Sequence, residues 1–178
     1  TRYGHAFAYY RKGNFDKSLP LINSLLEERP NNPYLYELKG QIYYNKGDLE
    51  TSIKAYQKSI ELLPDSGLLQ ISYAYALLAA QEKKDAREKE VIRILPRAIL
   101  IEKNSSEPHH LLGIAYGRQG NEGMSALHLA EEAFMNNKTE LAKINIRRAL
   151  GRLEKGSPSY LHAESLLEKV KTAEDKKN

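Results

Sequence analysis

The chain has 178 residues, of which 41% are hydrophobic and 28% are charged, a balance typical of a folded globular protein rather than a disordered one. The formal net charge is +4, but 23 acidic residues are interspersed with the 27 basic ones, which argues against a nucleic-acid-binding surface. The absence of cysteine excludes disulfides, zinc–thiolate sites and thiol catalysis, and no apolar run approaches the ~20 residues that a membrane span needs.

The amino end gives no indication of a secretory signal. It begins TRYGHAFAYY, which lacks the successive charged, apolar and small-residue segments of a signal peptide. Because the first residue is Thr1 rather than methionine, we expect the chain to be a fragment or a processed product of a longer protein. Any targeting signal would then lie outside this sequence.

A 34-residue period relates the first two segments of the chain. Gly13 and Gly47 are one period apart, as are Pro30 and Pro64, and the segments YYRKGNFDKSLPLINSLLEERP and YYNKGDLETSIKAYQKSIELLP align without a gap. Apolar residues within each unit recur at helical spacing. The pattern therefore predicts units of two helices joined by a tight turn.

Local signals mark where these helices begin and end. Gly13 and Gly47 stand where a first helix should end in a left-handed residue. Side chains that accept hydrogen bonds from backbone amides are expected to start the next helices, in two cases with proline at the first helical position. The predicted capping residues are Asn14, Asp48, Asn32 before Pro33, and Ser157 before Pro158.

The third unit departs from the period. It keeps a first helix around Tyr73 and Leu77, but the polar run QEKKDAREKE stands in place of the turn. Because Ala98 lies about five residues late, we expect an insertion in this turn. Pro96 lies in the second helix, where the missing amide would cost ~3 kcal/mol. We therefore expect either a kink or a helix that is broken before Pro96.

Beyond Gly120 the predicted units overlap. The segment 124–150 serves as the second helix of the fourth unit and, by its own spacing, as the first helix of a fifth, with a turn at Asn137. We predict a single domain, 1–172, closed by a capping helix, and a charged tail. The predicted ranges are units 1–31, 32–65, 66–104, 105–137 and 124–156, the cap 157–172 and the tail 173–178.

The residues of the second unit are similar to a known repeat. A glycine in the first helix is followed by an aromatic residue, a turn glycine, small residues and a closing proline: Gly40, Tyr43, Gly47, Ser52, Ser59 and Pro64. This pattern resembles the tetratricopeptide repeat, and the fourth unit repeats it with Leu112, Gly113, Tyr116 and Gly120. The first unit departs from it at His5 and Ala6, and the second at Leu38. The resemblance implies an all-α fold, a right-handed superhelix of about ten helices.

No catalytic or metal-binding motif is found. Gly40 and Gly47 do not form a phosphate-binding loop, because their spacing is wrong, Asp48 follows and no strand precedes them. There is no HExxH motif, and the adjacent His109 and His110 point to different faces of a helix. We predict no enzymatic activity and no cofactor for this chain, and partly exposed positions for its histidines. The basic residues Lys143, Arg147, Arg148 and Arg152 are predicted to form an exposed stripe, or else to contact an acidic partner or lipid headgroups.

Tyrosines on the first helices indicate where a protein or peptide ligand would bind. In stacked helix pairs the first helices line the concave side, and tyrosine combines a large contact area with a polar tip. The alternative is that these rings only stack between repeats. Tyr43 is expected to pack inside, whereas Tyr44, one step of ~100° further round the helix, should face the ligand. The predicted concave-face residues are Tyr3, Phe7, Tyr10, Arg11, Tyr34, Glu37, Gln41, Tyr44, Asn45, Ile71, Tyr75, Leu78, His110, Ile114 and Arg118.

Longer segments carry a closer resemblance. NNPYLYELKGQIYYNKGD and GIAYGRQGNEGMSALHLAEEAF are similar to the C-terminal repeat region of bacterial periplasmic HExxH zinc metallopeptidases, which are related to CaaX-processing and beta-barrel assembly-enhancing proteases. The resemblance implies a periplasmic, non-catalytic half that binds substrates or partners, such as its own protease domain or an outer-membrane assembly machine. Zinc would belong only to the missing protease domain. The alternative is a stand-alone scaffold for a secretion, pilus or envelope complex, and a cytoplasmic location stays open.

Overall fold

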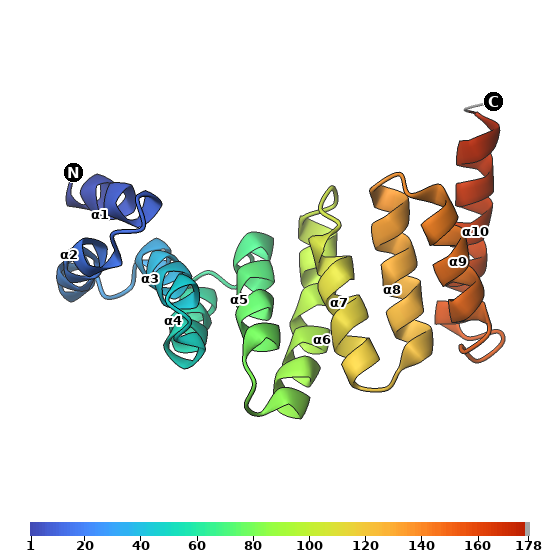
Figure 1. Cartoon of the computed structure of the whole chain (residues 1–178), viewed down its shortest axis with the longest axis horizontal. Helices are drawn as coiled ribbons and strands as arrows, with labels where there is room; N and C mark the ends of the chain where they lie inside the picture. Colours follow the sequence, from blue (N-terminus) through green and yellow to red (C-terminus); the bar gives the residue numbers. More distant parts are fainter. Residues whose placement is uncertain (177–178) are drawn as a thin grey trace. The chain divides into compact units, whose positions relative to one another are not determined.

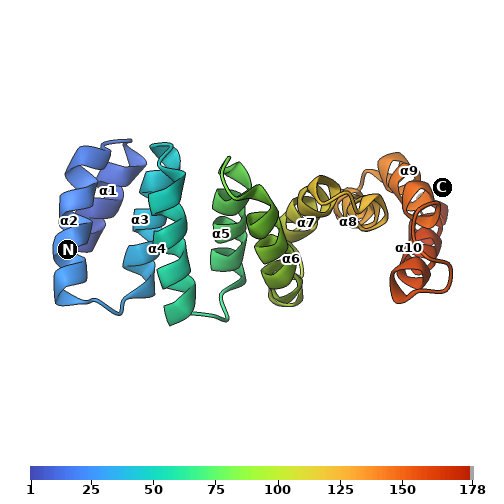
Figure 2. The same cartoon turned by 90° about the horizontal axis from the view of Figure 1, so that it is seen from below.

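The computed structural model describes residues 1–176 (Figures 1 and 2). Those residues contain ten α-helices and no strand, which confirms the predicted all-α fold class. The helices are α1 (Arg2–Arg11), α2 (Phe15–Glu28), α3 (Pro33–Asn45), α4 (Leu49–Leu62), α5 (Gly67–Ala79), α6 (Lys84–Ile101), α7 (Glu107–Arg118), α8 (Glu122–Met135), α9 (Thr139–Leu150) and α10 (Pro158–Asp175).

The helices belong to two compact units. The first, Thr1–Glu82, contains α1 to α5, and the second, from Lys83 onward, contains α6 to α10. Within each unit every helix packs against the next one along the chain, and α10 also contacts α8. The core of the first unit includes Ala6, Ile22, Leu38 and Ile42. That of the second includes Ala130, Ala133, Ala142, Ile146, Leu166 and Val170.

One turn geometry recurs in both units. Gly13, Gly47 and Gly120 have positive φ angles of 70°, 79° and 76°, and Asn137 takes the same place with φ 58°. In each turn the next residue's N–H donates to the carbonyl five residues earlier, at 2.8 to 3.0 Å, which satisfies an orphan carbonyl at the helix end. The predicted left-handed helix ends are confirmed. So are the predicted caps, since Asn14, Asn32, Asp48 and Ser157 all accept a backbone N–H.

Small residues bring the two helices of a pair together. The Ser52 hydroxyl donates to the carbonyl of Gly40 at 2.8 Å, and a Cβ atom on Gly40 would lie 3.0 Å from the ring of Tyr56. Gly40 is therefore a contact point between α3 and α4, as predicted. The same serine-to-carbonyl bond, always twelve residues back, joins Ser18 to Ala6 and Ser125 to Gly113 at 2.7 Å. Ala6, where the repeat usually has glycine, is fully buried.

Helix α8 pairs in the same way with the helix on either side of it. The turn at Gly120 joins α7 to α8, and the turn at Asn137 joins α8 to α9. Ala130 and Ala142 are twelve residues apart, like the serine-bonded pairs, and both are fully buried. The double role expected for the segment 124–150 is thus visible in its turns and in its small residues.

The extra residues of the third repeat, 66–104, lengthen a helix rather than a turn. Only residues 80–83 separate α5 from α6, so the residues DAREKE belong to α6, which has 18 residues against 14 in α4. The insertion was expected in the turn, and this position is wrong because the extra residues belong to α6. The expected break at Pro96 is also wrong, because α6 runs from Lys84 to Ile101 with Pro96 inside it. Pro96 is exposed, so its ring does not disturb the core.

The last helix is longer than the predicted cap. Helix α10 begins at Pro158 and continues to Asp175, so residues 173–175 of the predicted charged tail are helical. Its buried residues Ala163, Leu166 and Val170 recur at intervals of three and four, which places them on one side of the helix. Residues 177–178 of that predicted tail lie outside the described residues.

Candidate functional site

The first helices of the first unit present matching stripes of side chains. Residues of α1 and α3 that are 34 positions apart hold equivalent places. Spacings of three, four and seven residues put each set on one side of its helix. The equivalent pairs are Tyr3 with Glu37, Phe7 with Gln41, Tyr10 with Tyr44, and Arg11 with Asn45.

Five of the predicted ligand-contacting residues line one hollow of about 370 Å³ in the first unit. The Nδ2 atom of Asn45 donates to the hydroxyl of Tyr10 at 3.5 Å, which connects α3 to α1. Tyr44 is 36% exposed, whereas Tyr10 and Tyr75 are half-buried. We call this hollow the tyrosine groove. Its lining residues are Tyr10, Gln41, Tyr44, Asn45, Tyr56, Ser72 and Tyr75.

Sequence reasoning missed two residues of the tyrosine groove, Tyr56 and Ser72. Tyr56 lies on the second helix of its unit and is only 3% exposed, so its spacing indicates a core residue. Its ring nevertheless reaches the groove, because Gly40 leaves room for it to cross from α4 to the α3 side. Burial raises the pKa of Tyr56, and the nearby Glu37 carboxylate raises it further, while a hydrogen bond with Ser72 lowers it.

The Glu37 carboxyl lies one helical turn before Gln41 on the same side of α3. It is half-buried, and burial raises its pKa. The pKa of the Tyr3 hydroxyl is also raised, first by burial and then by the charge of Glu37. Glu37 therefore acts electrostatically on tyrosines of α1 and α4 alike.

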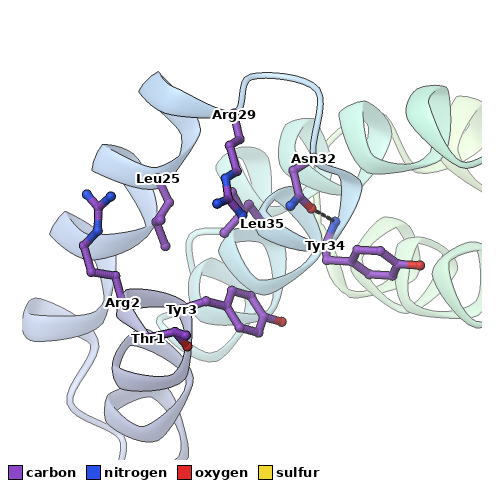
Figure 3. A pocket seen from close by; sticks show the side chains of 8 residues that line it. All are labelled: Thr1, Arg2, Tyr3, Leu25, Arg29, Asn32, Tyr34 and Leu35. Carbon is purple, nitrogen blue, oxygen red and sulfur yellow. Dashed lines mark hydrogen bonds between the residues drawn. The ribbon is translucent and has the colours of Figure 1, made fainter.

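A larger hollow of about 590 Å³ lies beside the amino end of α1 (Figure 3). Arg2 donates to the carboxylate of Glu28 at 2.7 and 2.6 Å, and Asn32 accepts the N–H of Tyr34 at 3.0 Å. The ring of Tyr34 points away from Leu35 in Figure 3. The predicted residues Tyr3 and Tyr34 thus border this hollow and not the tyrosine groove. Its lining residues are Thr1, Arg2, Tyr3, Leu25, Arg29, Asn32, Tyr34 and Leu35.

Two predicted ligand-facing residues on α5 are buried instead. Ile71 is 3% exposed and Leu78 is 6% exposed, so neither presents a side chain to a ligand in this structure. The physical reason is that α5 buries nine of its 13 residues, so one exposed stripe cannot be read from its spacing. Tyr43, expected to pack inside, is half-buried, and its neighbour Ile42 is the fully buried residue.

Phe7 and Arg11 are exposed on α1 and line neither hollow. The other three predicted ligand-facing residues lie on α7, in the second unit. His110 Nδ1 is 3.0 Å from Glu132 Oε2 of α8. Ile114 is half-buried and Arg118 is exposed. These three residues are therefore placed on one helix but do not belong to the tyrosine groove.

Three histidines of the second unit, His109, His128 and His162, interact with neighbouring side chains, and we call them the histidine cluster. His109 Nδ1 and His128 Nδ1 are 3.0 Å apart, and the His128 ring stacks on Tyr116 with centroids 5.6 Å apart. His162 of α10 bonds to Glu131 of α8. Burial lowers the pKa of His109, and burial together with the His109 charge lowers that of His128 to about 4. The bond to Glu131 raises the pKa of His162.

Within residues 1–176 no group of three or more His, Asp or Glu side chains is arranged to hold a metal ion. The predicted basic stripe is also reduced, because Lys143 is half-buried and pairs with Glu140 and Glu174. In that described range no helix is both long and apolar enough to cross a membrane.

Residues 3–67 match the family model of the tetratricopeptide repeat. Over 66 residues the chain is 33% identical to a TPR repeat-containing protein of Methanocaldococcus jannaschii. That match covers 37% of this chain and 12% of that protein, so the chain spans only a small part of this relative.

Solved structures share the fold over nearly the whole chain. A MamA protein is 18% identical with a TM-score of 0.70, covering 99% of this chain and 91% of its own. MamA of Desulfovibrio magneticus RS-1 is 15% identical with a TM-score of 0.70, covering 99% and 95%. PilW, described as a type IV pilus biogenesis factor, is 14% identical with a TM-score of 0.61, covering 97% and 90%. These likenesses support the repeat fold and leave the metallopeptidase resemblance untested.

Proposed function

We propose that this tetratricopeptide repeat chain is a non-catalytic module that binds a segment of another protein in its tyrosine groove. The observation that carries the proposal is the convergence of Tyr10, Tyr44 and Tyr75 with the amides of Gln41 and Asn45 around one open hollow. Three helices supply these residues, so the hollow depends on the fold of the first unit and not on one helix. Such a hollow suits a peptide better than a small reactive substrate, since no nucleophile paired with a base lines it.

The chemistry of the lining fits a peptide backbone. The amides of Gln41 and Asn45 can each donate and accept hydrogen bonds, as a backbone requires. Tyrosine rings bury a large area while only two side-chain torsions are restricted, so binding costs little rotamer entropy. Tyr44 lines the groove and is 36% exposed, so its ring is accessible to a bound peptide.

For the parent protein we propose the role implied by the resemblance, the substrate- or partner-binding half of a periplasmic zinc metallopeptidase. A stand-alone scaffold for a secretion, pilus or envelope complex is the second candidate, and the fold likeness to PilW favours it. The codons upstream of Thr1 discriminate between them. An HExxH helix encoded there would support the first candidate, whereas a signal peptide or a stop codon directly before Thr1 would eliminate it.

The binding role is tested by selecting peptides from a random displayed library on the intact chain. We expect a shared sequence pattern among the selected peptides, and at least tenfold weaker binding to the variant Tyr44→Ala/Tyr75→Ala, about the loss typical of truncated interface tyrosines. Binding is measured by fluorescence anisotropy, and helical content and melting by circular dichroism.

Tyr9→Ala is the matched control for this experiment. It also removes a tyrosine ring, but from a position on α1 that does not line the groove. The centroid of the Tyr9 ring lies 5.7 Å from the ammonium group of Lys17 on α2. Binding to this variant should be unchanged. Equal binding to the double variant would contradict the proposal, and unfolding of the double variant would show that the rings belong to the core.

A further inference from the structure

Glu37 is a half-buried carboxylate without a partner. Within residues 1–176 its oxygens accept no hydrogen bond and pair with no cation. Burial alone raises the pKa of Glu37, and no basic side chain within the described residues opposes that shift. A carboxylate that has lost part of its water without gaining a donor destabilises the state in which it stands.

The nearby cations of the first unit are engaged elsewhere. On α3 itself, Lys39 donates to Asn23 at 2.9 Å and Lys46 pairs with Asp16 at 3.4 Å, so both lysines turn toward α2. Arg11 lies in register with Asn45, eight residues from the level of Glu37, which is about 12 Å along a helix. These three cations therefore do not neutralise the charge of Glu37.

The surroundings of Glu37 suit a cation. Its charge acts on the hydroxyls of Tyr3 on α1 and Tyr56 on α4, so two tyrosines lie within electrostatic reach of it. Tyrosine rings attract ammonium and guanidinium groups through their faces. The stripe on α3 continues from Glu37 to Gln41 and Tyr44, both of which line the tyrosine groove.

We propose that the peptide bound in the tyrosine groove places a lysine or arginine side chain against Glu37. This inference rests on the proposed function and adds the chemistry of the ligand to it. The ligand cation supplies a positive charge and hydrogen-bond donors, which Glu37 lacks within the described residues. Binding therefore offsets the free energy lost when this carboxylate is partly dehydrated in the free protein. A carboxylate at the same place in the ligand would instead face a like charge in a partly dehydrated site.

The test uses the same displayed peptide library on three forms of the intact chain. Peptides selected on the natural chain should be enriched in lysine or arginine at one fixed position. Glu37→Gln should abolish this preference, and Glu37→Lys should convert it to aspartate or glutamate. For one selected peptide, replacing its arginine by citrulline should weaken binding about tenfold on the natural chain and not on Glu37→Gln, as expected for one partly buried ion pair.

Glu27→Gln is the matched control, because it removes an exposed carboxylate of α2 that lines neither hollow, and it should leave the lysine or arginine preference intact. Selected peptides that depend on Tyr44 but show no basic position would overturn this inference and leave the proposed function standing. Peptides indifferent to Tyr44 would overturn both.

Discussion

At the scale of single residues, the absence of a side chain at Gly40 has the clearest consequence. A Cβ atom there would lie 3.0 Å from three carbons of the Tyr56 ring, closer than packed carbon atoms approach. Tyr56 is 3% exposed, so its ring has little room to move. The glycine is thus required by the contact between helices and not by its backbone angles.

We predict that Gly40→Ala lowers the free energy of unfolding by about 1–3 kcal/mol, the usual cost of an overpacked core. The variant should also weaken peptide binding, since the displaced Tyr56 ring lines the groove. Gly4→Ala is the control, because Gly4 is exposed near the start of α1 and an added Cβ would be close only to Thr1 Oγ1, at 3.3 Å, so stability should change by no more than about 1 kcal/mol. Denaturant unfolding measures both, and equal stabilities of the two variants would contradict the prediction.

The histidine cluster predicts opposite pH effects from neighbouring residues. The pKa of His128, about 4, is below its ordinary value, so the unfolded chain binds this proton more readily and stability falls as the pH drops below about 6.5. His162 has a raised pKa, so its contribution is fully present below about 6.5 and is lost as the pH rises through the folded value. Glu131 has a lowered pKa and stabilises until the pH falls through that value.

We therefore predict that His128→Gln reduces the loss of stability between about pH 7 and about pH 5 by on the order of 1 kcal/mol, whereas His162→Gln increases that loss. The physical reason for the first is burial, which disfavours the charged ring of His128, and after it the charge of the His109 ring 3.0 Å away. Melting temperatures of the three proteins at both pH values measure the effect. Because each protein is compared with itself, a constant loss from the substitution cancels, and parallel pH dependences would contradict the assignment.

At the scale of helices, the recurring turn explains why so much of the fold could be predicted. A glycine in the left-handed region followed by a capping side chain is a local signal, and it fixed the ends of α1, α3 and α7 without knowledge of their neighbours. The extra residues before Val91 were placed in a turn because periodicity counts residues but does not say whether they extend a helix. Ile71 and Leu78 were misassigned because α5 is buried on several sides.

We predict that Asn137→Gly stabilises the chain by about 0.5–1 kcal/mol and that Gly47→Asn destabilises it by a similar amount. Asn137 has φ 58° in the turn where the other three pairs use glycine, and a Cβ atom on Gly47 would meet nothing within 4 Å. Only the backbone angle should therefore matter at either position. Thermal melting of the two variants checks the signs, and the same sign for both would show that side-chain contacts dominate the turn.

At the scale of the whole molecule, the groove and the histidine cluster lie in different compact units. This division was not predicted, although the boundary at Glu82 and Lys83 falls within the polar run QEKKDAREKE, where the sequence departs from the 34-residue period. Tyr56 and Ser72 were missed because helices α1, α3, α4 and α5 together line the groove. The sequence pattern of one helix pair does not show how it packs against the next pair. The proposed partner chemistry, by contrast, depends on one side chain, Glu37, which has no partner within residues 1–176.

Because each helix packs mainly on its neighbours along the chain, destabilisation should stay local. We predict that Gly40→Ala accelerates amide hydrogen exchange in α3 and α4 by about tenfold or more under native conditions, while exchange in α9 and α10 changes less than about twofold. Ala142→Gly, which removes a fully buried methyl group from the second core, should produce the reverse distribution. Exchange followed by mass spectrometry on peptides from each helix distinguishes the two patterns. A uniform acceleration along the chain in either variant would mean that both units unfold together, and the binding groove would then owe its stability to the histidine-containing unit as well as to its own core.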